Sequence, residues 1–110
     1  MQNYTNYHVV YIDDASPDKT GDQVRKYIIS QNIPMDKVKV ITNQYNKKQI
    51  ENIYNAIYNH CKLGELALIV EGDDALIGTN VLNLYNAIYQ RDKCAMVYSS
   101  YLEIFSNSKV

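Results

Sequence analysis

The chain has 110 residues, which suits one folded domain, and we predict a single, partial domain over residues 1–110. Apolar residues make up 46% of the chain and charged residues 21%, which is the mixture of an ordinary globular protein. A net charge of −1 argues against nucleic acid as a partner. No leader peptide or membrane-spanning run is recognisable, so we expect a protein of the cytoplasm or of the cytoplasmic face of a membrane.

The first predicted element is a β-strand over residues 7–12, rich in Val, Tyr and Ile. It ends at Asp13 and Asp14, and the turn-forming sequence Ala-Ser-Pro-Asp follows. We expect a helix to begin at Thr20, because Thr20 and Gln23 have the spacing of a capping box, and to end before Pro34.

A second strand is predicted over residues 37–42, where the pattern alternates before it becomes apolar. The next helix is the clearest in the chain, and Asn46 with Gln49 has the spacing to cap it. Gly64 is expected to end this helix. Its apolar residues recur at helical spacing and predict one inward-facing stripe: Ile50, Ile53, Tyr54, Ile57 and Cys61.

Residues 66–70 are five consecutive apolar residues, too few for an ordinary helix, and they predict a strand over 66–71 buried on both faces. Further along, Thr79 is positioned to cap a third helix, and residues 95–98 predict a fourth strand. Strands alternate with helices throughout. The expected fold is therefore α/β, a three-layer sandwich with a mostly parallel sheet.

Two acidic loops follow predicted strands, one at Asp13 and Asp14 and one at Glu71, Asp73 and Asp74. In a parallel sheet the carboxyl ends of the strands share one edge, where ligands bind. The predicted strands therefore place both loops on the same rim.

Crowded carboxylates repel one another unless a cation or hydrogen-bond donors lie among them. A hard ion such as Mg²⁺ or Mn²⁺ takes oxygen ligands and bridges to phosphates. We therefore predict a divalent metal at the second loop, bound by one or two of its carboxylates. The alternative is a solvated acidic turn, and for Asp13 and Asp14 it is a turn or helix-capping device. Asn43 follows the second strand and is positioned either to bind ribose or phosphate or to form a solvated turn.

Residues 9–20 resemble the strand followed by DD-x-S-x-D-x-T in family 2 glycosyltransferases of the GT-A fold. Residues 40–46, 55–57, 64–65 and 71–76 follow that family's order and approximate spacing. The resemblance implies a Rossmann-like GT-A core that transfers a sugar from a nucleoside-diphosphate donor. It also implies a divalent metal, Mn²⁺ or Mg²⁺, on the diphosphate and an acceptor that is a glycan, a lipid or a protein.

The resemblance also implies roles for individual residues. Asp13 and Asp14 would contact the nucleoside, Glu71 would lie near the ribose, and Asp73 would be the metal-linked acid. The residues expected to bind the donor nucleotide are Asp13, Asp14, Ser16, Asn43, Glu71 and Asp73, and those expected to bind metal are Asp73 and Asp74.

The chain departs from the family at two places. Lys47, Lys48 and Gln49 occupy a stretch where the family commonly has Gly, and Glu71 replaces an Asp. Family members usually have a strand and helix before Tyr7, and an acceptor region with the catalytic base after Tyr98. We therefore expect the catalytic base to lie outside this chain.

Two other functions are compatible with the same sequence. One is a catalytically inactive module that binds a nucleotide sugar. The other is a receiver-type domain phosphorylated on Asp, although the separation from Asp13 to Asp73 is long for that arrangement.

Overall fold

The computed structural model describes residues 2–100 and 102. Contacts divide the chain into two compact units. The larger unit holds residues 5–75, and the smaller unit holds residues 2–4 together with the described residues from 76 onward. All the predicted site residues belong to the larger unit.

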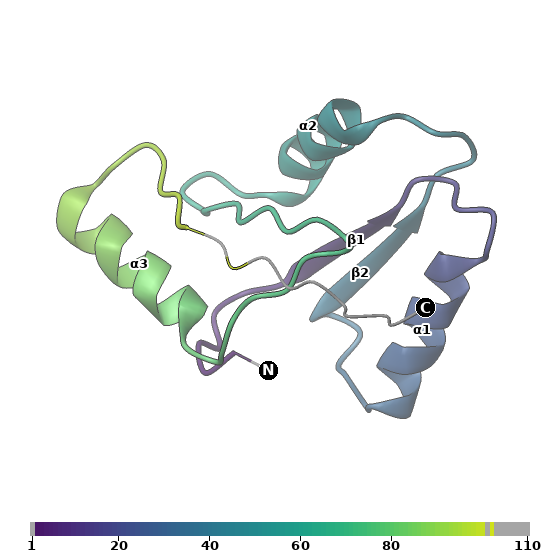
Figure 1. Cartoon of the computed structure of the whole chain (residues 1–110), viewed down its shortest axis with the longest axis horizontal. Coiled ribbons are helices and arrows are strands. Elements are labelled where there is room, and N and C mark those ends of the chain that lie inside the picture. Colours follow the sequence, from purple (N-terminus) through teal and green to yellow (C-terminus); the bar gives the residue numbers. More distant parts are fainter. Residues whose placement is uncertain (1, 101, 103–110) are drawn as a thin grey trace, which may run out of the picture. The chain divides into compact units, whose positions relative to one another are not determined.

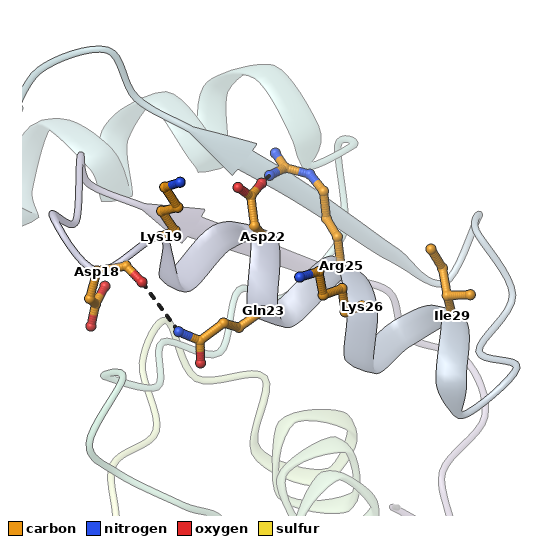
Figure 2. Close-up of a pocket in the computed structure, with 7 residues that line it drawn as sticks. All are labelled: Asp18, Lys19, Asp22, Gln23, Arg25, Lys26 and Ile29. Carbon is orange, nitrogen blue, oxygen red and sulfur yellow. Dashed lines mark hydrogen bonds and ion pairs between the residues drawn. The ribbon is translucent and has the colours of Figure 1, made fainter.

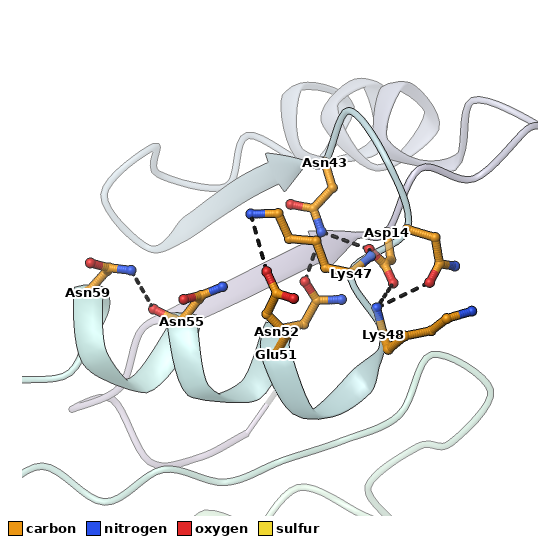
Figure 3. A network of polar contacts seen from close by, with 9 residues as sticks. Asp14, Asn43, Lys47, Lys48, Glu51, Asn52, Asn55 and Asn59 are labelled. Carbon is orange, nitrogen blue, oxygen red and sulfur yellow. Dashed lines mark hydrogen bonds and ion pairs between the residues drawn. The ribbon is translucent and has the colours of Figure 1, made fainter.

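The larger unit contains β1 (Val9–Asp13), α1 (Thr20–Ser30), β2 (Val38–Thr42) and α2 (Gln49–His60) (Figure 1). The two strands pair in parallel, with Val9 opposite Val38 and Asp13 opposite Thr42. The sheet lies between α1 and α2, as the views in Figures 2 and 3 agree. The predicted α/β class, with parallel strands and a helix layer on each face, is confirmed.

Helix α1 begins at the predicted residue, but the predicted capping box does not form. Lys19 occupies the N-cap position in the left-handed region, at φ 57°. The carboxylate of Asp18 accepts hydrogen bonds from both the backbone N–H and the hydroxyl of Thr20. Gln23 donates to the Asp18 carbonyl at 3.2 Å (Figure 2). Asp18 therefore accepts hydrogen bonds from both side chains of the predicted capping box, Thr20 and Gln23.

Helix α2 also lacks its predicted capping box, although it begins at Gln49. The Asn46 side chain accepts a hydrogen bond from the Lys48 N–H at 3.1 Å, before the helix begins. Gln49 donates to Glu71. The Gln49 side chain, which the capping box would have directed to Asn46, therefore hydrogen-bonds to Glu71 instead.

The strands predicted over residues 66–71 and 95–98 are not formed within the described residues. Leu66, Leu68, Ile69 and Val70 are between 44% and 55% exposed. An apolar run indicates a tendency to be buried, whereas a strand also needs a neighbouring backbone that forms hydrogen bonds with its N–H and C=O groups. The sheet described here contains β1 and β2 only, and residues 66–71 do not pair with either strand.

The predicted inward-facing stripe of α2 is wrong for three of its residues. Ile50 is 83% exposed, and Tyr54 and Ile57 are also exposed. The side of α2 that lines a hollow with Ile12 and Ile41 of the sheet carries asparagines instead. No hydrophobic side chain among the described residues is fully buried.

The smaller unit contains α3 (Val81–Asp92). The predicted cap, Thr79, uses its carbonyl to accept the Asn3 N–H at 2.7 Å and does not cap the helix. The side-chain oxygen of Gln2 instead accepts the N–H of Leu82 at 3.2 Å, in the first turn of α3. A residue distant in sequence thus takes the predicted role of the local hydroxyl. Within the described residues, every helix is too short or too polar to cross a membrane.

Candidate functional site

The candidate site is built on the edge where β1 and β2 both end. Because the strands are parallel, Asp13 and Thr42 lie opposite each other in the ladder. The Asn43 N–H donates to the Asp13 carbonyl at 2.9 Å, which extends the pairing one residue beyond β2. The loops that follow the two strands therefore leave the sheet side by side.

Asp13 is only 4% exposed, and the chain itself uses both of its carboxylate oxygens. The Ser16 N–H donates to Oδ1 at 2.9 Å, and the Gly21 N–H donates to Oδ2 at 3.0 Å. Hydrogen bonding from Ser16 and from the Gly21 backbone, together with the nearby positive charge of Arg25, lowers the pKa of Asp13 despite its burial. Asp13 thus ties the end of β1 to the first turn of α1 and fixes the path of the loop between them.

Asp14 binds the second loop in the same way (Figure 3). Its Oδ1 accepts the Lys47 N–H at 2.8 Å and the Asn43 side-chain amide at 2.8 Å, and its Oδ2 accepts the Lys48 N–H at 3.0 Å. These donors, with the Lys47 backbone foremost, lower the pKa of Asp14 to about 2. The Asn43 amide also donates to Asn52 at 2.8 Å, so the network continues into α2.

Glu71, Asp73 and Asp74 form an exposed acidic cluster. One carboxylate oxygen from each residue lies within 4.8 Å of the others. The Asp74 N–H donates to the Glu71 carbonyl at 3.1 Å, which closes the turn that gathers the three side chains. Hard oxygen donors at this spacing fit a divalent ion such as Mg²⁺ or Mn²⁺, which binds a few carboxylates and completes its shell with water or phosphate.

A single side chain connects the acidic cluster to the Asp14 network. Gln49 donates to Glu71 Oε1 at 2.6 Å, and Gln49 directly follows Lys48, whose N–H binds Asp14. The start of α2 is therefore bonded to both acidic loops. The structure brings the two predicted groups of carboxylates to one edge of the larger unit.

A hollow of about 360 Å³ extends from this edge along α2. Asn55, which belongs to the resemblance, is among the polar residues that line it. The full lining comprises Ile12, Ile41, Asn43, Lys47, Asn52, Asn55, Ala56, Asn59 and His60.

Three contributors were not predicted from the sequence: Gln49 as a bridge, and Asn52 and Asn59 on the wall of the hollow. Asn52, Asn55 and Asn59 are spaced by three and four residues, which places them on one side of a helix. This spacing could have predicted a polar face on the helix, but the apolar residues of the same helix dominated the prediction.

The model of the family described as glycosyl transferase family 2 matches residues 1–109. The chain belongs to glycosyl transferase family 2. No curated protein and no solved structure gives a significant match.

Membership in glycosyl transferase family 2 assigns glycosyl transfer as the general class of reaction, with a nucleotide sugar as donor and a second molecule as acceptor. The family's enzymes commonly use a divalent metal, and the acidic cluster supplies ligands suited to one. The α/β arrangement of the larger unit agrees with the Rossmann-like fold of the family.

Proposed function

We propose that the larger unit binds the nucleoside diphosphate of a sugar donor at the edge formed by the two acidic loops. The observation that supports this most is the bonded path from Asp14 through Lys48 and Gln49 to Glu71. A nucleoside diphosphate carries a polar base and ribose at one end and a charged diphosphate at the other. A hydrogen-bonding loop beside an acidic cluster suits both ends.

In this proposal Asp13 and Asp14 act differently. Asp13 is buried and shapes the loop that presents Ser16. Asp14 and Asn43 are half-buried and form the polar wall toward the nucleoside. Glu71, fixed by Gln49, lies at the ribose.

Asp73 and Asp74 are the proposed metal ligands. Both are exposed, and their carboxylate oxygens reach within 4.8 Å of each other and of Glu71. A bound Mn²⁺ or Mg²⁺ would neutralise charge on the departing diphosphate. The chain's own residues would hold the ion and orient the nucleoside, and we assign no catalytic base to them.

The test is titration of UDP and GDP by calorimetry, with and without Mn²⁺. Asp73→Asn removes one ligand charge, and we expect it to weaken metal-dependent binding at least about tenfold. Asp36→Asn is the matched control, because Asp36 is an exposed carboxylate near the opposite end of β2. Nucleotide binding that is indifferent to Mn²⁺ and to Asp73→Asn would refute the proposed metal site.

Incubation with UDP-sugars or GDP-sugars and added acceptors separates donor binding from transfer, because transfer moves the sugar to the acceptor and frees the nucleoside diphosphate. A chain that binds the nucleotide but forms no glycosylated acceptor would be a nucleotide-sugar-binding module. A chain that binds neither nucleotide would refute the proposal as a whole.

A further inference from the structure

Lys48 lies between the two acidic loops and has a backbone conformation that suits glycine. Its φ is 70° and its ψ is 162°, a combination that residues with a β-carbon rarely adopt. Both of its backbone groups are bonded: the N–H donates to Asp14 Oδ2 at 3.0 Å, and the carbonyl accepts the Asn52 N–H at 3.1 Å. These bonds fix the strained conformation. A glycine would form both of them with less strain.

The side chain of Lys48 has no role in the fold that would explain the strain. It is exposed, and its ammonium forms no hydrogen bond or ion pair among the residues that the structure describes. Figure 3 shows contacts reaching the Lys48 backbone nitrogen, whereas the ammonium extends away from them. Lys47 differs, because its ammonium lies 3.9 Å from Glu51 Oε1 and 5.7 Å from the centre of the Tyr45 ring. The Lys48 ammonium is therefore open to a ligand.

The charges of the acidic cluster favour a cation beside the phosphates of a bound nucleotide. The three carboxylates carry three negative charges, and a divalent ion would supply two positive ones. One negative charge remains and opposes the approach of a diphosphate. Lys48 is bonded to Asp14 and directly precedes Gln49, which donates to Glu71. Its backbone is therefore at the junction between the polar wall and the cluster.

We propose that the Lys48 ammonium binds the diphosphate of the nucleotide donor and offsets this remaining charge. The inference rests on the proposed function, because the nucleoside at Asp14 and the ion at the acidic cluster define where the diphosphate lies. A lysine ammonium is a compact charge on a flexible stem, and it binds phosphate oxygens as a point charge. The strained backbone is thus tolerated at a position where the side chain serves binding and not folding.

Calorimetric titration of the full chain with UDP and GDP in the presence of Mn²⁺ tests this role, using whichever nucleotide the parent chain binds more tightly. Lys48→Ala removes the ammonium and keeps a β-carbon, and we expect it to weaken nucleotide binding about fivefold to twentyfold. Lys48→Arg keeps the positive charge and should bind within about threefold of the parent. Lys39→Ala is the matched control, because Lys39 is an exposed lysine near the other end of β2. It should bind within about twofold of the parent.

Two further measurements separate binding from a structural role. Lys48→Gly relieves the backbone strain, so we expect the urea midpoint to rise by about 0.3–1 M while nucleotide binding weakens as in Lys48→Ala. Binding of Mn²⁺ without nucleotide should be no weaker in Lys48→Ala, because the change removes a positive charge and no metal ligand. A lysine needed only for the fold would instead lower the urea midpoint when replaced.

Weaker nucleotide binding by Lys48→Ala and Lys48→Gly, with Lys48→Arg and Lys39→Ala close to the parent, would support the proposal. Parent-like binding by Lys48→Ala would overturn the role of Lys48 and leave the proposed function standing. A parent chain that binds neither UDP nor GDP would overturn both. Equal losses in Lys48→Ala and Lys39→Ala would also overturn the role of Lys48, since the effect would then be one of net charge.

Discussion

Replacing Gly21 with alanine tests whether the buried carboxylate of Asp13 organises the first loop. A methyl group at Gly21 would lie 2.7 Å from Asp13 Oδ2 and 2.7 Å from Thr42 Oγ1. It would also lie 3.3 Å from the Asp13 Cβ. Both oxygen contacts are shorter than van der Waals contact allows. The carboxylate must therefore move away from the Gly21 N–H that it accepts at 3.0 Å.

The cost combines three effects. Losing a hydrogen bond to a charged group costs about 1.5–3 kcal/mol, and overpacking costs about 1–3 kcal/mol. The higher helix propensity of alanine returns about 0.5–1 kcal/mol. We expect Gly21→Ala to lower the free energy of unfolding by about 2–5 kcal/mol, because Asp13 is buried and solvent cannot replace the lost donor.

Urea unfolding followed by circular dichroism measures this difference. Gly72→Ala is the control, because a methyl group there meets nothing within 4 Å. We expect the control to change the free energy of unfolding by less than about 0.5 kcal/mol. If Gly21→Ala were as mild as Gly72→Ala, Asp13 could not be held as described and the reasoning would fail.

Three further predictions concern the other contacts of the edge. Asn43→Ala should raise the pKa of Asp14 from about 2 toward its usual 3.8, but not fully, because the Lys47 N–H remains; an NMR titration showing no rise would contradict this. Because the pKa of Asp14 is lowered by folding, its ionisation stabilises the fold above pH 3.8. That contribution should be lost as the pH falls from 3.8 through about 2. Urea midpoints that do not decrease over this pH range would count against the network. Gln49→Ala should release Glu71 and speed amide exchange at the acidic cluster about threefold to tenfold, as followed by NMR, whereas unchanged exchange would show that Gln49 does not hold the turn.

Much of the larger unit was predictable because its signals are local. The β-rich run before Asp13, the alternation before Thr42 and the helix that follows Lys48 are all present where periodicity indicated them. Parallel pairing then required Asp13 and Asn43 to lie at one edge. The family resemblance rested on these same residues, and the family match agrees with it.

The failed predictions share a physical cause. Residues 66–70 are apolar enough for a strand, yet a strand is completed by a neighbour, and no local pattern reports whether that neighbour is present. The prediction of an inward-facing stripe on α2 was wrong for the same reason. An apolar residue such as Ile50 favours burial, but the sequence does not show whether another element covers it. The capping boxes failed because distant or intervening groups, Asp18 and Glu71, took the side chains concerned.

The amino-acid sequence alone indicated the two strands and two helices that the larger unit forms, and that acids follow two apolar runs, but it also indicated a strand over residues 66–71 that is not formed. Tertiary structure decided what each acid does. Asp13 and Asp14 are adjacent in the chain, but Asp13 is directed to α1 and Asp14 to the loop before α2. The physical reason is that hydrogen-bond partners are chosen by position in space, and residues eight or thirty-four positions apart meet only after the sheet and helices have packed.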